Sequence, residues 1–354
     1  MEKVLSIVIP TYNMEKYLDK CLTSLIVHDE ELMSRLEVLI VIDGAKDRSS
    51  EIAHGYQERF PATFKVIDKE NGNYGSCVNR GLKEARGKYI KILDADDCFD
   101  TPRFIRYLSL LLQTDSELVI NNYTIVNEKG ASVSKHQRSL EEQRLYEQKD
   151  ILPYLTCNYL AMHEVAYKVS LLREHNYVQT EGISYTDQEW VLFPVAWAKT
   201  VSYINENIYL YLVGREGQTV SSSVASRSVG HSVIRIKNTI TLYNKYQEKD
   251  ELSGQYVKKR IVSESERVYL RYIYMGRAVL DMGELESFDQ EVKHNNQEIY
   301  NALEYEKLAG FIPFRYIAEW RKGNLRKLKF FNPVIDIMLA YKRYNFNIKS
   351  ALAR

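Results

Sequence analysis

Short apolar strands alternate with helical segments over roughly the first hundred residues, and this alternation constrains the fold more than any other feature. Apolar runs rich in β-branched residues lie at 4–9, 36–42, 63–67 and 89–93, and helical periodicity follows at 14–27, 49–59 and 74–85. Strands and helices at this spacing predict an α/β fold with a doubly wound, mostly parallel sheet.

The pattern becomes less regular beyond this part. Another strand is expected at 118–126, whereas the polar segment 127–150 lacks periodicity and predicts a connection or an acceptor-side insertion. Further regular structure is expected at 161–174, with a helix at 187–198, short tyrosine-rich strands at 201–213 and mostly helix from about residue 226. We therefore divide the chain into a first domain at 1–220, with halves at 1–126 and 127–220, and a mostly helical region at 221–354.

Charge and cysteine content exclude several classes of protein. Lysine plus arginine number 48 against 47 for aspartate plus glutamate, which predicts no nucleic-acid partner. The four cysteines lack the spacing of a zinc or redox motif and are expected to be reduced thiols. The first apolar run stops at Pro10, too short for a signal peptide or a membrane span, so a cytoplasmic location is expected.

Polar clusters follow three of the expected strands, at 11–13, 43–44 and 94–97. The carboxyl ends of parallel strands share one edge of a sheet, so these clusters are expected to converge there. The carboxylates of Asp94 and Asp96 are hard oxygen ligands that suit Mg²⁺ or Mn²⁺, and such an ion would grip a diphosphate. An isolated acidic turn is more often a solvated helix cap, and the position after a strand offsets only part of that preference.

Asp43 and the glycines near residue 72 are weaker candidates. Asp43 ends a strand, where its carboxylate can accept a hydrogen bond from a base or a sugar, or alternatively cap the next helix. Asn71 and Gly72 come before a helix N-terminus, which favours anions.

Four ordered blocks carry a family resemblance, at 7–13 (IVIPTYN), 42–44 (IDG), 70–72 (ENG) and 81–97 (GLKEARGKYIKILDADD). Together they resemble the nucleotide-binding half of the inverting family 2 glycosyltransferases, which have the GT-A fold. The resemblance implies a D-x-D metal motif at Asp94 and Asp96, with Asp97 sharing or supporting the metal. It also implies a nucleotide site, with Asp43 facing the base, that includes Pro10, Thr11, Tyr12, Asp43, Asn71, Gly72 and Asp94.

Two positions depart from the family pattern. Ile42 stands where the first acid of a common D-D-G is usual, and Val78 stands where an arginine often precedes Asn79. These departures leave the fold as predicted but put the exact base and phosphate contacts in question.

Further along, Tyr185 to Trp190 resembles the family's E-D block, in which the aspartate is the catalytic base. Inverting transfer needs one carboxylate to take the proton of the acceptor hydroxyl, which assigns the base to Asp187. A helix cap is the alternative role for Asp187, and Glu189 is the second candidate base. Arg215 lies where relatives place a segment that closes over the donor and is expected to bind the diphosphate, unless it is an ordinary exposed loop arginine.

The segment 311–349 mixes aromatic residues with many lysines and arginines. This composition suits docking at the inner face of an anionic membrane, although a solvated helix pair or a face that packs on a partner subunit, as in a homodimer, has the same composition.

The resemblance implies a metal-dependent inverting glycosyltransferase that uses a nucleotide-diphosphate sugar, with UDP favoured, in cell-surface polysaccharide synthesis. Its acceptor would be a hydroxyl of a glycan or lipid-linked saccharide. A sugar nucleotidyltransferase is disfavoured because no glycine-rich basic loop follows the first strand, and a NAD enzyme because no G-x-G-x-x-G does. A non-catalytic nucleotide-binding scaffold remains the main alternative.

Overall fold

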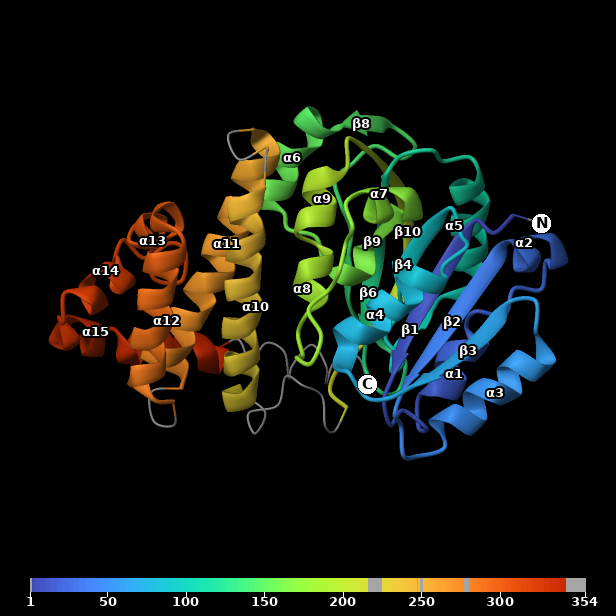
Figure 1. Cartoon of the computed structure of the whole chain (residues 1–354), viewed down its shortest axis with the longest axis horizontal. Helices are drawn as coiled ribbons and strands as arrows, with labels where there is room; N and C mark the ends of the chain where they lie inside the picture. Colours follow the sequence, from blue (N-terminus) through green and yellow to red (C-terminus); the bar gives the residue numbers. More distant parts are fainter. Residues whose placement is uncertain (1, 216–224, 247, 249–250, 277–279, 342–354) are drawn as a thin grey trace. The chain divides into compact units, whose positions relative to one another are not determined.

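The computed structural model describes residues 2–215, 225–246, 248, 251–276 and 280–341 (Figure 1). The chain forms two compact units, the first made mainly of Met1–Glu216 and the second of Gly217–Leu352. The functional halves expected at 1–126 and 127–220 stay a prediction.

In its described part, the first unit is built on one ten-stranded sheet in which eight strands follow the order β3-β2-β1-β4-β9-β6-β10-β5. β7 pairs with β6 and β8 with β10 at the side of this path. The strands are β1 (Leu5–Thr11), β2 (Leu36–Asp43), β3 (Phe64–Lys69), β4 (Tyr89–Ile92), β5 (Cys98–Phe99), β6 (Leu118–Val126), β7 (Ser132–His136), β8 (Leu145–Glu147), β9 (Val165–Lys168) and β10 (Thr200–Leu212).

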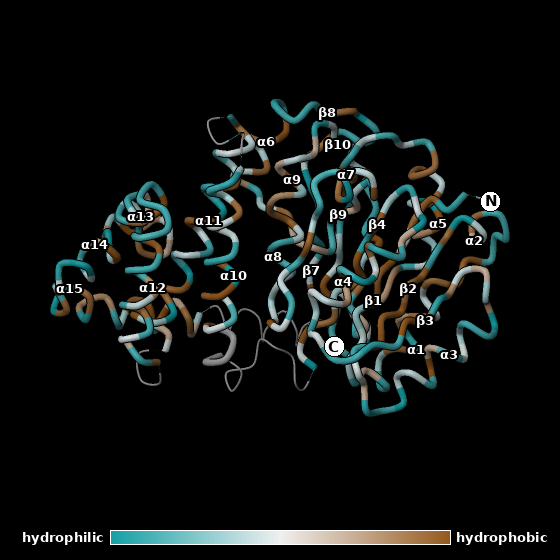
Figure 2. The backbone as a smooth tube through the Cα atoms, in the orientation of Figure 1, coloured by the Kyte–Doolittle hydropathy of each residue, from teal (hydrophilic) through white to brown (hydrophobic). Residues whose placement is uncertain are grey.

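The predicted parallel sheet is confirmed for β1 to β4, which pair in parallel in the order β3-β2-β1-β4. Every residue of β2 is buried, and Figure 2 shows the brown, hydrophobic colour along β1 and β2. Helices cover both faces of such a sheet, so its strands read as continuous apolar runs. The later half is mixed: β9 runs antiparallel to both β4 and β6, so β6 and β10 again run in the direction of β1.

The helices of the first unit include three that the sequence reading did not identify, α2, α5 and α6. The first two begin at an aspartate cap, because Asp29 Oδ1 accepts from Leu32 N at 3.0 Å and Asp100 Oδ1 accepts from Arg103 N at 3.2 Å. The helices are α1 (Leu18–Thr23), α2 (Glu30–Arg35), α3 (Ser49–Arg59), α4 (Asn73–Glu84), α5 (Thr101–Leu112), α6 (Gln148–Cys157), α7 (Val169–Glu174), α8 (Asp187–Trp190) and α9 (Phe193–Trp197), with a short 3-10 turn η1 (Met162–Glu164).

Three expectations about single elements were wrong. The helix expected at 14–27 is confined to α1, and the helix expected at 187–198 is two short helices, α8 and α9. Pro194 in the first turn of α9 lacks the amide proton that a continuous helix would use there, which accounts for the break. The short strands expected at 201–213 are one 13-residue strand, β10, with irregular register between Ile204 and Tyr209.

The segment 127–150 is ordered although its sequence lacks periodicity. It contributes β7, β8 and the start of α6, and it is held by an ion pair in which Arg138 donates two bonds of 2.7 Å to Glu164. Both side chains are almost completely buried. A buried charge is stable only with such a partner, so this long-range pair, rather than local propensity, explains the order.

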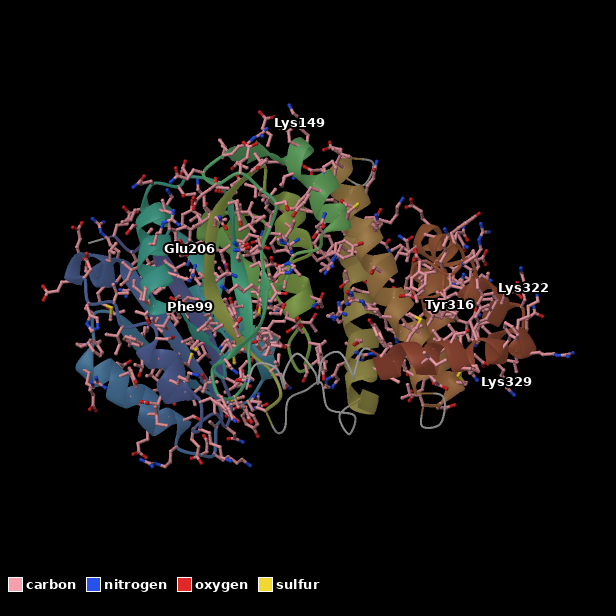
Figure 3. All side chains as sticks on the ribbon, turned by 180° about the vertical axis from the view of Figure 1, so that it is seen from behind. Phe99, Lys149, Glu206, Tyr316, Lys322 and Lys329 are labelled. Atoms are coloured by element: carbon pink, nitrogen blue, oxygen red, sulfur yellow. The ribbon has the colours of Figure 1, made fainter. Side chains whose placement is uncertain are left out.

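The described part of the second unit is helical, as expected. Tyr316 lies inside it and donates a 2.6 Å hydrogen bond to Glu266, while buried Arg321 contacts Asp289 at 2.8 Å (Figure 3). Within the described residues, no helix has the length and apolar character needed to cross a membrane. The elements are α10 (Ala225–Lys245), α11 (Leu252–Leu270), a π-helix at Arg271–Met275, α12 (Met282–Asn295), α13 (Gln297–Leu303), α14 (Tyr316–Arg321) and α15 (Leu325–Phe330).

Candidate active site

Three carboxylates gather directly after β4, at the edge of the sheet where β1 and β2 also end. One oxygen each of Asp94, Asp96 and Asp97 lies within 4.8 Å of the others, a grouping able to hold a cation. Because these residues follow the parallel strand β4, the strand direction carries them to the edge that the sequence indicated.

Tyr74 supports the first of these acids. Its hydroxyl donates to Asp94 Oδ1 at 2.8 Å and also contacts Met162 Sδ at 2.8 Å. Burial, followed by the charge of Asp96, raises the pKa of Asp94. Tyr74 was not identified from the sequence as a site residue; its position in the first turn of α4, beside Asn71 and Gly72, was the available signal.

Asp97 is held from β10. Its Oδ2 accepts from the Tyr209 hydroxyl and its Oδ1 accepts from Leu212 N, both at 2.7 Å. Tyr209 in turn accepts from Asp94 N at 3.2 Å. Asp97 therefore links the acidic turn to β10, and a period-two run of tyrosines at 209–211 was the sequence signal for this contact.

Asp96 forms an ion pair with Arg215. Arg215 Nε lies 2.6 Å from Asp96 Oδ2, and each side chain is only 14% exposed. The structure thus joins two residues that the sequence reading had assigned separately, to the metal and to the diphosphate. The rest of the predicted donor-closing segment, from residue 216, lies outside the described residues.

Asp187 opens α8 close enough to the acidic cluster for its charge to act there. Gln188 Nε2 donates to Asp187 Oδ2 at 2.9 Å. The Asp187 charge contributes, after burial and nearer groups, to the raised pKa values of both Asp94 and Tyr74. The N-cap position of α8 is Thr186, whose side chain makes no cap hydrogen bond, and Asp187 is the first residue of the helix.

Glu189, the second candidate base, has a different setting. Its two carboxylate oxygens accept from Thr180 N and Thr180 Oγ1, each at 2.7 Å. The loop that contains Thr180 packs closely against α4, because a Cβ on Gly75 would lie 2.0 Å from the carbonyl oxygen of Thr180. Glu189 therefore holds the loop that leads to Asp187.

Asp43 ends β2 in a network of its own. Its Oδ1 accepts from Lys69 Nζ at 2.6 Å and from Gly72 N at 2.9 Å, and its carbonyl accepts from Asn71 Nδ2 at 2.9 Å. Gly44 follows with φ +68°, a left-handed conformation that favours glycine. The structure therefore brings Asp43, Asn71 and Gly72 together, and it adds Lys69, which the sequence reading missed.

The other predicted nucleotide residues follow β1. Thr11 is buried and donates from Oγ1 to the carbonyl of Ile9 at 3.1 Å; Pro10 is half-buried and Tyr12 is exposed. Thr11 lies in register with Ile42 of β2, so both strand ends meet at one edge. Ile42 and Val78, where the sequence departs from the family pattern, are buried core residues.

Comparison with known proteins gives a consistent result. Residues 6–175 match the model of "Glycosyl transferase family 2". This chain carries a family 2 glycosyltransferase domain.

Its curated relatives include EpsJ of Bacillus subtilis (strain 168), an uncharacterized glycosyltransferase that is 37% identical over 34% of this chain and 33% of its own length. They also include the poly(ribitol-phosphate) beta-N-acetylglucosaminyltransferase TarS of Staphylococcus aureus, 24% identical over 72% of this chain and 44% of its own length. The chain therefore spans less than half the length of these two relatives.

The fold of the chain that carries this domain also matches solved structures. The crystal structure of S. aureus TarS 1-349 in complex with UDP-GlcNAc has a TM-score of 0.62 and 17% identity, covering 84% of this chain and 81% of that one. The predicted GT-A-like fold with a helical C-terminal region is thereby confirmed.

Proposed function

We propose that this chain is a metal-dependent, inverting glycosyltransferase that moves a sugar from a UDP-sugar donor to a hydroxyl of a glycan or lipid-linked saccharide acceptor. Cell-surface polysaccharide synthesis is the proposed setting, because the relatives include TarS, whose name assigns it a polymer acceptor. The donor class is supported by the structures of TarS with UDP-GlcNAc and with UDP, which have this fold.

One observation carries the proposal: three carboxylates able to hold a cation gather after β4, and the charge of a separate carboxylate, Asp187 of α8, contributes to the raised pKa of one of them, Asp94. Inverting transfer needs both parts, a cation site for the departing diphosphate and a base for the acceptor. A scaffold protein would need neither.

The residues present fit a divalent metal. Asp94 and Asp96 supply hard oxygen ligands of the kind that Mg²⁺ and Mn²⁺ prefer, and Asp97 is engaged by β10 and supports them. When bound, such an ion supplies positive charge to a leaving diphosphate.

The chain's own residues then divide the remaining work. Asp187 takes the proton from the acceptor hydroxyl as that oxygen attacks the anomeric carbon and the bond to the diphosphate breaks, so no covalent enzyme intermediate forms. Asp43, with Asn71, Gly72, Pro10, Thr11 and Tyr12, surrounds the nucleotide. Arg215 exchanges its ion pair with Asp96 for the diphosphate, whose oxygens it binds through its planar guanidinium.

Calorimetric titration of the full chain with UDP, GDP and dTDP, each with and without Mn²⁺, tests this function without an acceptor. We expect UDP binding that depends on the metal. Binding of another nucleotide alone would overturn the donor assignment, and no binding to any of them would favour the scaffold alternative.

Replacing Tyr74 by phenylalanine removes the hydroxyl that donates to Asp94 while keeping the ring. Contacts that orient a metal ligand are typically worth roughly 10–100-fold in metal affinity. We therefore expect the Mn²⁺ concentration that gives half-maximal UDP binding to rise by a factor of that order. Mn²⁺ titration at fixed UDP measures it. Tyr305→Phe, at an exposed tyrosine of the second unit, serves as the control, and an equal effect of both changes would refute the supporting role.

We further propose that the segment 311–349 docks on an anionic membrane. Its described part includes the exposed lysines Lys322 and Lys327, both of which pair with Glu319. Its exposed large apolar side chains are Phe311, Leu325, Phe330, Val334, Ile337 and Tyr341. Apolar side chains can enter the interface while lysines face anionic headgroups.

Liposome co-sedimentation with phosphatidylglycerol vesicles tests this docking. We expect Phe330→Ser/Ile337→Ser to lower the bound fraction several-fold, since each loses on the order of 1.5–3 kcal/mol of apolar burial. Leu145→Ser, at an exposed leucine of β8, is the control. Unchanged sedimentation of the double variant would argue against docking.

A further inference from the structure

A basic pocket lies at the opposite edge of the sheet from the acidic cluster. It has a volume of about 880 Å³ and is lined where β1 and β4 begin and where β9 passes into α7. The chain's overall charge is close to neutral, yet six cations line this pocket: Lys3, Arg35, Arg86, Lys88, Lys168 and Arg173. The carboxylates among the lining residues are Glu2 and Glu174.

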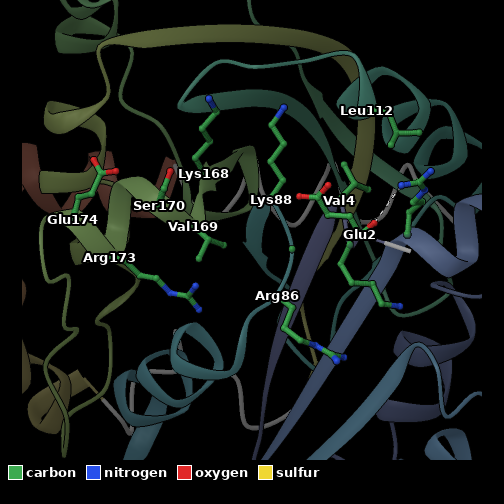
Figure 4. A pocket seen from close by; sticks show the side chains of 13 residues that line it. Glu2, Val4, Arg86, Lys88, Leu112, Lys168, Val169, Ser170, Arg173 and Glu174 are labelled. Carbon is green, nitrogen blue, oxygen red and sulfur yellow. Dashed lines mark hydrogen bonds between the residues drawn. The ribbon is translucent and has the colours of Figure 1, made fainter.

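Two of the cations share a single carboxylate. Lys88 Nζ and Lys168 Nζ lie 3.0 and 2.8 Å from the same oxygen of Asp115, whose side chain is 80% exposed. Figure 4 shows these two lysines side by side and pointing the same way. One exposed acid therefore offsets two positive charges at this side of the pocket.

Two further cations contact backbone carbonyls in place of carboxylates. Arg173 donates to the carbonyls of Leu82 and Ala85 at 3.1 and 2.7 Å, and Lys3 donates to those of Leu36 and Ala62 at 2.7 Å each. Among the described residues, neither cation forms an ion pair. The fold therefore fixes the positions of these two cations, and no carboxylate among the described residues neutralises them by an ion pair.

The remaining two cations are partly offset. Arg86 bonds buried Glu37 at 2.6 Å but keeps 67% of its side chain exposed, and Arg35 meets Glu31 only at 3.8 Å. Burial lowers the pKa of Lys3, while the nearby charge of Glu37 raises it and that of Arg86 lowers it further.

We propose that this basic pocket binds a phosphate-type oxyanion, carried by a free phosphate or by a phosphate-bearing chain. Guanidinium groups match phosphate oxygens in geometry, and lysines add point charges. β1 has seven residues, so this pocket lies about 20 Å from the acidic cluster at about 3.3 Å per residue. This separation makes it a second site, independent of the proposed donor site, and a phosphate-bearing chain could be held there while another part of it reaches the reaction edge.

Calorimetry of the full chain with inorganic phosphate and with tripolyphosphate, in EDTA and at constant ionic strength, tests the proposal. EDTA removes the metal that the acidic cluster would need to hold a phosphate. We expect saturable binding of one anion per chain. Similar affinity for both probes would point to a free phosphate, and much tighter binding of tripolyphosphate to a chain; absence of saturable binding to either would overturn the proposal.

Variants locate the anion. Arg173→Gln is expected to weaken binding roughly tenfold, the effect of losing about 1.4 kcal/mol of charge-assisted contact. Glu2→Gln, at an exposed residue, is expected to tighten it, which keeps the test valid if Arg173→Gln fails to fold. Arg144→Gln, at an exposed arginine that pairs with Glu141, and Arg215→Gln at the acidic cluster are matched controls. Equal loss in either control, or no change in Glu2→Gln, would overturn the assignment.

Discussion

Asp187→Asn is expected to lower sugar transfer by roughly 10²–10⁴-fold, the range typical for loss of a general base, while UDP binding stays within experimental error. Asparagine keeps the shape and can still bond Gln188, which now donates to Asp187 at 2.9 Å, but it cannot accept the proton of the acceptor. Single-turnover transfer assays and nucleotide calorimetry on the same variant separate the two effects.

Glu189→Gln is the matched comparison, since it changes the neighbouring acid of the same short helix. Its carboxylate bonds Thr180 twice, so we expect a lower melting temperature and a modest loss of rate. If Glu189→Gln loses transfer by the larger factor and Asp187→Asn keeps it, the base would be Glu189.

Asp96→Ala is expected to abolish the metal dependence of UDP binding. The change removes one of two proposed metal ligands. The loss of metal affinity should therefore exceed the roughly 10–100-fold that is typical of a supporting contact and that we expect for Tyr74→Phe. It also leaves Arg215 without the carboxylate that lies 2.6 Å from it. UDP calorimetry across a Mn²⁺ series measures the effect.

Asp68→Asn provides the control for Asp96→Ala. Asp68 is an exposed acid on β3 that pairs with His54 of α3, and β2 and β1 lie between β3 and the strand β4 that leads to the acidic turn. We expect its metal dependence to match that of the unchanged chain. An unaltered Mn²⁺ series in Asp96→Ala would place the metal elsewhere.

Local sequence was sufficient for much of the first unit. The runs at 36–42 and 118–126 were predicted as strands and appear as β2 and β6. β2 is buried along its whole length, which explains its nearly continuous apolar run. The helix predicted at 49–59 is α3 with the same limits. Local sequence failed at 127–150 and at 187–198, where a buried ion pair between Arg138 and Glu164 and the proline of α9 decide the structure.

The sequence by itself determined the alternation of β1 to β4 with α1, α3 and α4 and the edge on which Asp94 and Asp96 lie, since both follow from strand direction and apolar patterning. The tertiary structure alone decided which side chains support these acids: Tyr74 lies 20 residues from Asp94, and Tyr209 lies 112 residues from Asp97. It also decided the reversal of β9 and the gathering of six cations in one pocket. Contacts between residues so far apart in the sequence depend on how the sheet is assembled, so the local pattern of residues does not predict them.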